Sequence, residues 1–306
     1  MIDITYGGTA AGKTAVALGY FDGLHLGHVG VINAALAQEG LSPAVFTFNR
    51  DTTLPKFKKP EDIISFENKC ELFEKMGVEY VYAPDFAEVC GLSAEEFVSE
   101  ILIKRLNAGF ACCGTNFRFG KGGLGTPEML SEIGAKYGMR AQTVPDVCSD
   151  GVMISSTHIR ELIRNGDIQQ ANGLLGYELW YRLVVVRGNE IGRTLSFPTI
   201  NQIIPETNVI PRFGVYSSFA EVNGVKYRGV TNIGVKPTVK HRHDGGGVVM
   251  ETHIIGFDGD LYGQKIAVAL RRFIRPEREF AGLSELKAQI AADKQAVLSE
   301  TEGERF

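Results

Sequence analysis

The sequence predicts two domains: an α/β domain with a mostly parallel sheet, followed by an antiparallel β-barrel or sandwich. Strand-like and helix-like segments alternate through residues 1–178, and their short connections suit a sheet covered by helices on both faces. From Tyr181 onward the pattern changes to short strands with alternating apolar and polar residues. The 306 residues suffice for two domains of ordinary size. We therefore expect domains at residues 1–178 and 179–306.

Within the first domain, apolar segments of strand length alternate with segments of helical spacing. The expected strands are residues 15–21, 43–49, 78–86, 110–117 and 139–147. The expected helices are residues 28–40, 65–76, 93–107 and 126–138, followed by two short helices at 154–167 and 168–176. Two of these helices have typical start signals: a capping box from Ser93 to Glu96, and Thr126 followed by Pro127.

The second domain begins with strands and ends with a helix. The expected strands lie in residues 181–188, 213–234, 248–257 and 265–274. Asn223-Gly224 is a strong hairpin signal because it separates two alternating segments. Residues 284–300 have the spacing of an amphipathic helix, which we expect to pack across the barrel or sandwich.

Composition indicates a globular protein and argues against several classes of partner. Hydrophobic residues make up 44% of the chain and charged residues 22%. No run of about 18 apolar residues occurs, and residues 1–14 lack the basic and apolar regions of an export signal. We therefore expect a cytoplasmic protein without a membrane partner. The formal net charge is -4 with no basic stripe, so we expect no nucleic-acid partner.

The five cysteines do not form a metal or disulfide pattern. Their number is odd and none has CxxC spacing, which argues against a zinc site and a disulfide framework. Cys112 and Cys113 lie in an apolar run and are expected in the core.

Residues 7–14, GGTAAGKT, match the pattern of a phosphate-binding loop. Such a loop joins a strand to a helix, so that loop N–H groups and the helix N-terminus face the phosphates. After Thr14, however, Val16 and Leu18 alternate with smaller residues, which indicates a strand. We therefore predict a glycine-rich turn before the first core strand.

The stretch GYFDGLHLGH, residues 19–28, places His25 and His28 between an expected strand and an expected helix. A phosphate there would meet helix N–H groups, the positive end of the helix dipole and two imidazoles. Gly27 would let the backbone approach the ligand. Two histidines in a loop are more often surface residues, and a metal site lacks an evident third ligand. The strand–HxGH–helix order nevertheless favours a nucleotidyltransferase site.

A second candidate anion site lies in ISSTHIRELIRNGD, residues 154–167. Ser155 or Ser156 can cap a helix whose first turn carries Thr157 and Arg160. Hydroxyls, a guanidinium and helix N–H groups together suit phosphate. Taken alone, the segment is more typical of an ordinary helix cap with a solvated arginine, but its pairing with the HxGH motif favours the anion site.

With these motifs in order, the chain resembles the bacterial family of bifunctional riboflavin kinase/FAD synthetases. The resemblance covers nearly the whole length. It depends on the blocks GYFDGLHLGH, CGTNFRFGKG, ISSTHIRELIRNGDIQQANGLLG, GRTLSFPTIN, GVTNIGVKPTV, METHIIGFDGDLYG and RRFIRPEREF. It implies a Rossmann-like nucleotidyltransferase domain, followed by a riboflavin kinase barrel with a C-terminal helix.

For the first domain, the resemblance implies transfer of AMP from ATP to FMN, which yields FAD and pyrophosphate. His25 and His28 would hold ATP phosphates and offset charge as pyrophosphate leaves. Asn116 would contact nucleotide phosphate or flavin, and the segment after Ile154 would grip the β- and γ-phosphates. The implied ATP-binding residues are Gly19, Phe21, Asp22, Gly23, His25, Gly27, His28, Asn116, Ser156, Thr157 and Arg160.

For the second domain, the resemblance implies phosphorylation of riboflavin by ATP. Thr199 and Asn201 place two oxygen-bearing side chains on one side of an extended segment, as Mg²⁺ bound to ATP would need. The family assigns both residues to the Mg-ATP site, and Glu251 would accept the proton of the ribityl hydroxyl. The implied ATP-binding residues are Gly188, Gly192, Arg193, Pro198, Thr199 and Asn201. The partners expected are therefore the small molecules ATP, riboflavin and FMN.

The sequence departs from the family at three places. The family usually has Asp-Pro-His-Pro where this chain has Asn49-Arg50-Asp51-Thr52, so an amide replaces a frequent carboxylate. Ser196 stands where glycine is usual, and Gly256 where an acidic residue is common. The first departure keeps open a kinase with a weakened adenylyltransferase domain. A non-catalytic flavin- or nucleotide-binding regulator is a third interpretation, although binding alone would not require the candidate base Glu251.

Overall fold

The computed structural model describes residues 1–4, 8–48, 61–149, 151–188, 197–235 and 247–300. By its contacts the chain forms two compact units. The first comprises Met1–Pro60 and Ser65–Ser156, and the second comprises Glu61–Ile64 and Thr157–Phe306. These units divide earlier in the chain than the predicted boundary at 178–179, which stays a prediction for the catalytic domains.

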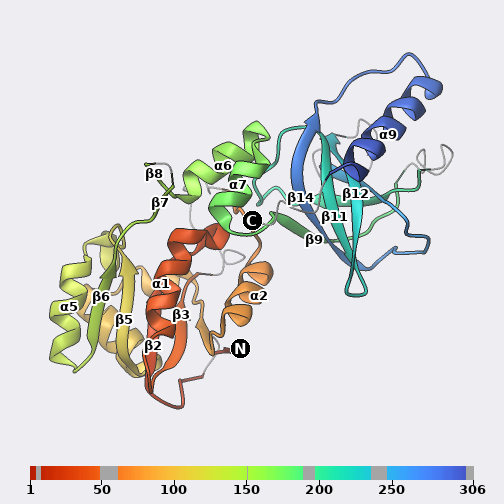
Figure 1. The fold of residues 1–306 in the computed structure, drawn as a ribbon. Coiled ribbons are helices and arrows are strands. Elements are labelled where there is room, and N and C mark those ends of the chain that lie inside the picture. Colours follow the sequence, from red (N-terminus) through yellow and green to blue (C-terminus); the bar gives the residue numbers. More distant parts are fainter. Residues whose placement is uncertain (5–7, 49–60, 150, 189–196, 236–246, 301–306) are drawn as a thin grey trace. The chain divides into compact units, whose positions relative to one another are not determined.

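The first unit contains a six-stranded sheet whose neighbouring strands all pair in parallel (Figure 1). The strand order is β1-β4-β3-β2-β5-β6. The strands are β1 (Ile2–Asp3), β2 (Thr14–Leu18), β3 (Ser42–Phe46), β4 (Tyr80–Tyr82), β5 (Ala108–Gly114) and β6 (Arg140–Val144). The predicted parallel sheet is confirmed, and the first residues of the chain form only a short edge strand.

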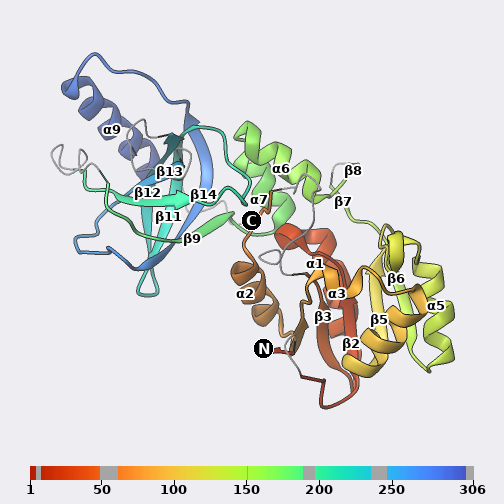
Figure 2. The same cartoon turned by 180° about the vertical axis from the view of Figure 1, so that it is seen from behind.

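Helices cover both faces of this sheet, as Figures 1 and 2 show from opposite sides. They are α1 (Leu26–Leu36), α2 (Phe66–Met76), α3 (Phe86–Val89), α4 (Ala94–Glu96), its π-helical continuation η2 (Phe97–Arg105) and α5 (Pro127–Lys136). On one face, the Cys112 thiol donates to the carbonyl oxygen of Val31 in α1. On the other, Leu102 of η2 and Leu130 of α5 belong to one core cluster with Val16 of β2. Residues of alternating direction on the central strands β2 and β5 are thus buried on both faces of the sheet.

The predicted helix starts are confirmed. Ser93 and Glu96 form the reciprocal bonds of a capping box, and Thr126 accepts a hydrogen bond from Met129 N ahead of Pro127. Each cap satisfies backbone N–H groups that the first helical turn leaves unpaired. A short hairpin of β7 (Cys148–Ser149) and β8 (Val152–Met153) ends the unit.

Lys13 leads into a strand and not into a helix. The next residue, Thr14, begins β2, and its hydroxyl donates to the carbonyl oxygen of Leu106 at 2.6 Å. No helix N-terminus therefore follows the GGTAAGKT segment, so the phosphate-loop interpretation fails and the predicted turn is confirmed.

The second unit contains a six-stranded antiparallel sheet in the order β10-β13-β12-β11-β14-β9. The strands are β9 (Trp180–Val184), β10 (Ile200–Ile204), β11 (Gly214–Val222), β12 (Val225–Val235), β13 (Val248–Ile254) and β14 (Lys265–Arg275). The two edge strands, β9 and β10, approach each other. Val186 N donates to the backbone carbonyl oxygen of Asn201 at 2.8 Å, and Gln202 Nε2 donates to the carbonyl oxygen of Leu183 at 2.7 Å. The sheet is therefore a nearly closed barrel, which resolves the choice between barrel and sandwich.

The hairpin between β11 and β12 turns at Asn223-Gly224, as predicted. Both residues have positive φ, 53° and 77°, as a type I′ turn requires. Inside the barrel, the hydroxyl of Thr231 lies 2.7 Å from that of Ser218 and 2.8 Å from that of Thr252. All three residues are buried, so the chain of hydroxyls satisfies polar atoms that would otherwise be unpaired in the core.

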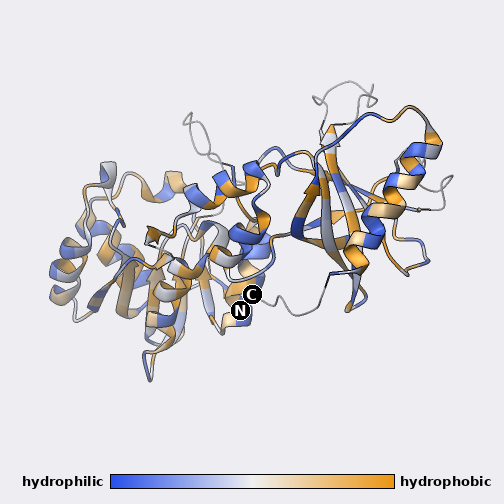
Figure 3. Ribbon diagram, turned by 45° about the horizontal axis from the view of Figure 1, so that its top comes forward, coloured by the Kyte–Doolittle hydropathy of each residue, from blue (hydrophilic) through white to orange (hydrophobic). Residues whose placement is uncertain are grey.

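The helices in the described part of the second unit include α6 (Ser156–Asn165), α7 (Ile168–Leu175) and α9 (Leu283–Leu298). Hydrophilic and hydrophobic residues are interspersed along α9 and along the barrel strands (Figure 3). Val297 of α9 packs with Val215 and Val230 of the barrel. The predicted C-terminal helix is confirmed.

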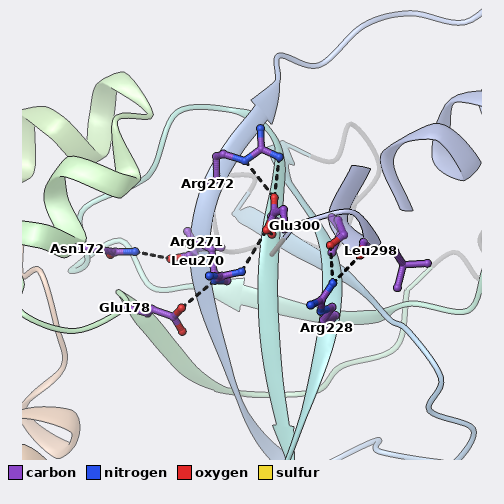
Figure 4. A network of polar contacts seen from close by, with 10 residues as sticks. Asn172, Glu178, Arg228, Leu270, Arg271, Arg272, Leu298 and Glu300 are labelled. Carbon is purple, nitrogen blue, oxygen red and sulfur yellow. Dashed lines mark hydrogen bonds and ion pairs between the residues drawn. The ribbon is translucent and has the colours of Figure 1, made fainter. Parts of the chain in front are cut away.

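Ion pairs fix the end of α9 to the barrel (Figure 4). The Glu300 carboxylate accepts from both Arg271 and Arg272, at 3.2 Å and 2.7 Å for the shortest contact of each, and from Ser217 at 2.6 Å. Arg228 donates to the carbonyl oxygens of Val297 and Leu298, which the last helical turn leaves unpaired. The helix is thereby held against one outer face of the barrel.

Candidate active sites

The first candidate site lies where the strand order of the parallel sheet reverses. β2 pairs with both β3 and β5, and the chain continues to β3 and β4 on one side and to β5 and β6 on the other. Ligands of open α/β sheets bind at such a switch point, outside the carboxyl ends of the strands. GYFDGLHLGH follows β2, and Asn116 follows β5. The topology thus brings two sequence-predicted segments to one edge of the sheet.

The turn after β2 has an unusual backbone. Phe21, Gly23 and Leu24 have φ values of 54°, 73° and 37°. Positive φ is strained for Phe and Leu, and such strain collects at functional sites. A side chain at Gly19 would lie 2.8 Å from the Phe21 ring, so glycine is required there. Asp22 is buried within the turn.

The two predicted histidines lie against each other at the start of α1. Their rings stack with centroids 3.6 Å apart and an interplanar angle of 18°. His25 Nδ1 accepts a hydrogen bond from His28 N at 3.4 Å, so His25 is the N-cap of α1 and its other nitrogen carries the proton. A side chain at Gly27 would lie 3.1 Å from the His25 ring, so the glycine makes room for it.

Both imidazoles are neutral in the free protein. Burial lowers the pKa of His25 to about 4, and burial also lowers the pKa of His28 well below its ordinary value, with smaller contributions from His25 and Lys69. His28 Nδ1 is buried and has no hydrogen-bond partner among the described residues. The site therefore offers imidazole nitrogens and N–H groups of α1 to a ligand, which is what an anion at a helix N-terminus would use.

Lys69 of α2 was not predicted from the sequence, although it supports the same turn. Its ammonium donates to Tyr20 O at 2.9 Å and lies 4.3 Å from the centroid of the Tyr20 ring. Thr47 donates to the same carbonyl oxygen at 2.9 Å. The lysine is almost fully buried, which is rare for an ammonium group. Its position in a polar stretch of helix gave no signal of this burial.

The second predicted anion segment is divided between the two units. In the first unit, the Ser156 hydroxyl donates to Asp22 O at 2.9 Å, which joins the start of α6 to the strained turn. Thr157 follows directly in the chain. In the second unit, Arg160 is buried and its Nε donates to Glu61 O at 2.7 Å. The structure thus connects Ser156 to the turn and gives Arg160 a backbone partner.

A cavity of about 340 Å³ in the first unit is lined mainly by aromatic rings. They are Phe46, Phe48, Phe86, Phe97, Phe117 and Phe119. Asn116 is exposed and does not line this cavity, although its neighbour Phe117 does. The cavity was not predictable from the sequence, because its rings come from four separate segments of the chain. Its flat apolar walls suit a planar ring system.

In the barrel, three polar residues lie side by side on adjacent strands. Asn201 of β10 is paired with Glu251 of β13, which is paired in turn with Asn232 of β12. Residues directly opposite each other in a sheet point to the same face. Two predicted residues, Asn201 and Glu251, are therefore brought together, and Asn232 joins them as an addition.

Two cavities meet at Thr199. One of about 600 Å³ is lined by Pro198, Thr199 and Asn201 together with the segment from Phe257 to Tyr262. The other, of about 280 Å³, lies under α9 and is lined by Thr199, Glu251, His253 and Asn232. The rest of its lining combines apolar side chains with the charged residues Arg275, Glu277, Arg278 and Asp293. Thr199 belongs to both linings, so a group bound in one cavity lies next to the other.

The remaining predicted kinase residues are only partly described. A side chain at Gly188 would lie 2.5 Å from the Asn201 amide, so glycine is required beside it. Gly192 and Arg193 lie outside the described residues, as do Ser196 and the segment from Asn49 to Thr52. Gly256 follows β13 with φ of 80°, a conformation that an acidic residue would adopt only with strain.

Comparisons with known proteins cover both units. The FAD synthetase family model matches residues 9–158, and the riboflavin kinase family model matches residues 175–300. A Bacillus subtilis protein named bifunctional riboflavin kinase/FMN adenylyltransferase is 38% identical over 294 residues, which cover 94% of this chain and 92% of that protein. An Escherichia coli K12 protein of the same name is 36% identical over 289 residues, covering 91% and 90%.

A crystal structure from Streptococcus pneumoniae has the same fold over the whole chain. It matches with a TM-score of 0.86 and 30% identity, covering 98% of this chain and 99% of that one. That protein is named a macrolide-efflux protein, which differs from the names of the other relatives. Among the described residues of the present chain, we find no helix with the length and apolar character needed to cross a membrane. Both family models and the full-length relatives agree with each other, and the chain therefore belongs to the family of bifunctional riboflavin kinase/FMN adenylyltransferases.

Proposed function

We propose that the barrel phosphorylates riboflavin to FMN with ATP, and that the α/β unit joins AMP from a second ATP to FMN, giving FAD and pyrophosphate. The observation that carries the kinase assignment is the position of Thr199 in the linings of two cavities. The larger cavity suits a nucleotide, and the smaller one places the Glu251 carboxylate among both apolar and charged side chains. A phosphate donor and a hydroxyl acceptor would therefore meet at this residue.

For phosphoryl transfer, riboflavin occupies the smaller cavity and ATP the larger one. Glu251 accepts the proton of the terminal ribityl hydroxyl, whose oxygen attacks the γ-phosphorus. The bond from that phosphorus to the bridging oxygen breaks, and ADP leaves. The role of the protein is mainly positioning, because the pairing of Asn201 with Glu251 sets the donor and acceptor sites on neighbouring strands.

Mg²⁺ fits the residues at the junction of the cavities. The Thr199 hydroxyl and the Asn201 amide supply hard oxygen atoms, and Mg²⁺ commonly takes few protein ligands because ATP phosphates and water complete its shell. Within the described ranges no group of three or more His, Cys, Asp or Glu side chains is arranged to hold a metal ion. When bound, the ion would offset the charge of the phosphates.

For adenylyl transfer, the flavin ring occupies the aromatic cavity of about 340 Å³. A phosphate oxygen of FMN attacks the α-phosphorus of ATP, and pyrophosphate leaves. N–H groups at the start of α1 and the imidazoles of His25 and His28 bind the phosphates. FMN supplies the nucleophile and ATP supplies the leaving group, so no covalent enzyme intermediate is needed.

The decisive experiment follows the products over time. Purified full-length protein is incubated with riboflavin, ATP and Mg²⁺, and riboflavin, FMN and FAD are separated at intervals. We expect FMN to appear first and FAD after it, and FMN supplied directly should yield FAD. FMN without any FAD would favour the monofunctional kinase, whereas binding without turnover would favour the regulator.

A further inference from the structure

A buried histidine, His253, lines the same cavity as Glu251. His253 lies two residues further along β13, so the alternation of the strand puts both side chains on the same face. Both line the cavity of about 280 Å³. The His253 residue is only 7% exposed, which makes its polar atoms dependent on partners inside the protein or in the cavity.

The contact of one ring nitrogen determines what the other can do. His253 Nδ1 lies 2.9 Å from the carbonyl oxygen of Pro198. A carbonyl oxygen only accepts hydrogen bonds, so Nδ1 carries the proton and Nε2 presents a lone pair. Burial is the largest cause that lowers the pKa of His253, and the charge of Lys294 adds to it, although the Pro198 contact opposes both. The ring is therefore a neutral acceptor at neutral pH.

His253 Nε2 has no partner among the described residues, although it is buried. A buried acceptor without a donor costs free energy, so the site is complete only when a donor enters. The ring is held in place on its other side by Phe197, whose ring meets it edge-on with centroids 5.4 Å apart. A fixed, unpaired acceptor beside a cavity is suited to recognise a hydroxyl or N–H of the ligand.

The spacing from Glu251 selects which part of the ligand is recognised. Alternate residues of a strand lie about 6.5 Å apart. This distance equals the length of a few carbons of a polyol chain. It is shorter than the length of a tricyclic ring with its attached chain. If Glu251 meets the terminal hydroxyl, His253 is then closest to another hydroxyl of the same chain.

We infer that His253 Nε2 accepts a hydrogen bond from a non-reacting hydroxyl of the ribityl chain of riboflavin, and so directs the terminal hydroxyl toward Glu251. The inference depends on the proposed kinase activity of the barrel. It adds a substrate-binding residue that distinguishes a flavin with a polyol chain from one without it.

Two variants separate this contact from a structural role. In His253→Asn the amide nitrogen replaces Nδ1 and can still donate to Pro198, but nothing replaces Nε2. In His253→Gln the amide oxygen lies near the position of Nε2, while the donor to Pro198 is lost. The KM for riboflavin is measured from FMN formation, together with the inhibition constant of lumiflavin, which has the ring but no polyol chain.

For His253→Asn we expect a KM for riboflavin raised roughly 5- to 30-fold, the usual range for losing one buried hydrogen bond, with the lumiflavin constant within about twofold of wild type. His253→Gln should retain more riboflavin affinity. Equal losses for riboflavin and lumiflavin, or a larger effect of His253→Gln than of His253→Asn, would overturn the inference and leave a role in holding Pro198.

A test on the unaltered enzyme does not depend on the folding of any variant. Among riboflavin analogues lacking the 2′-, 3′- or 4′-hydroxyl, one should show the same 5- to 30-fold rise in KM with wild-type protein. If all three retain the KM of riboflavin, no such contact exists. A wild-type protein that forms no FMN at all would instead refute the proposed kinase function, so the two failures are distinguishable.

Discussion

The ion pair between Arg275 and Asp293 offers a quantitative test of how α9 is held on the barrel. Asp293 has a side chain only 4% exposed, and it accepts from Arg275 Nη2 at 2.8 Å and Nε at 3.1 Å, and from Gln289 Nε2 at 2.8 Å. Breaking a buried pair of this kind by changing one partner typically costs about 3 to 5 kcal/mol. Asn retains one acceptor oxygen, so we expect Asp293→Asn to cost about 3 kcal/mol.

A matched control lies on the same helix. Arg278 and Glu285 also form an ion pair, at 3.1 Å, but their side chains are 45% and 47% exposed. Exposed pairs contribute at most about 1 kcal/mol, and Gln at position 285 can still accept from Ala281 N. Glu285→Gln should therefore change the stability of the barrel by less than 1 kcal/mol.

The assay uses the single tryptophan of the chain, Trp180, which lies on β9 of the barrel. Its fluorescence reports thermal unfolding of the second unit. For a unit of this size, a loss of 3 kcal/mol corresponds to a Tm lower by roughly 6 to 12 °C. If the Tm of Asp293→Asn is as close to wild type as that of Glu285→Gln, burial does not increase the contribution of the Arg275–Asp293 pair to stability, and the argument is refuted.

Four further predictions concern Glu251, His28, Lys13 and His25. Glu251→Gln should slow FMN formation roughly 10²- to 10⁴-fold and leave FAD formation from supplied FMN unchanged, because it removes the proposed base of the barrel alone. His28→Ala should show the reverse pattern when both reactions are measured, and a loss of both activities in either variant would indicate misfolding. Lys13→Ala should leave both activities nearly intact; a hundredfold loss of ATP turnover, about 3 kcal/mol in barrier, would restore the phosphate-loop interpretation. Burial lowers the pKa of His25 to about 4, so as the pH falls from 6.5 to 4 the unfolded chain binds a proton at this residue before the folded chain does. The first unit should therefore lose up to roughly 3 kcal/mol of stability in that pH range. Calorimetry should find a smaller loss for His25→Asn, and the same dependence of stability on pH in both proteins would contradict the prediction.

Most elements of both units followed from periodicity because each depends on neighbours close in sequence, whereas β10, α3 and the β7–β8 hairpin were not predicted. The strand from Thr14 and the cap at Ser93 are examples. Closure of the barrel was not predictable in this way. It depends on the hydrogen bond from Val186 N to Asn201 O and on those from the Gln202 side chain to Leu183 of β9 and Ile266 of β14. Such contacts between distant segments leave no local pattern in the sequence.

In the candidate sites, too, local motifs were predictable and contacts between distant segments were not. Motifs located His25, His28, Thr199 and Glu251, whereas the partners that complete each site come from distant segments. His253 could have been predicted from the sequence, because it lies two residues after Glu251 on a strand and so both side chains are on one face. Lys69 gave no such signal, since its burial depends on Tyr20 and Thr47 elsewhere in the chain.

The charge of the histidine pair depends on the fold in a way that residue types do not express. Two histidines beside a phosphate suggest two cations, but burial keeps both neutral in the free protein. Stacking at 3.6 Å would also place two positive rings in direct contact, which is unfavourable without an anion nearby. In the proposed site, the first attraction for phosphate would therefore come from the N–H groups of α1, which carry no titratable proton. We predict that a bound phosphate would raise the pKa of the imidazoles, so that their positive charge would arrive together with the negative charge that it offsets.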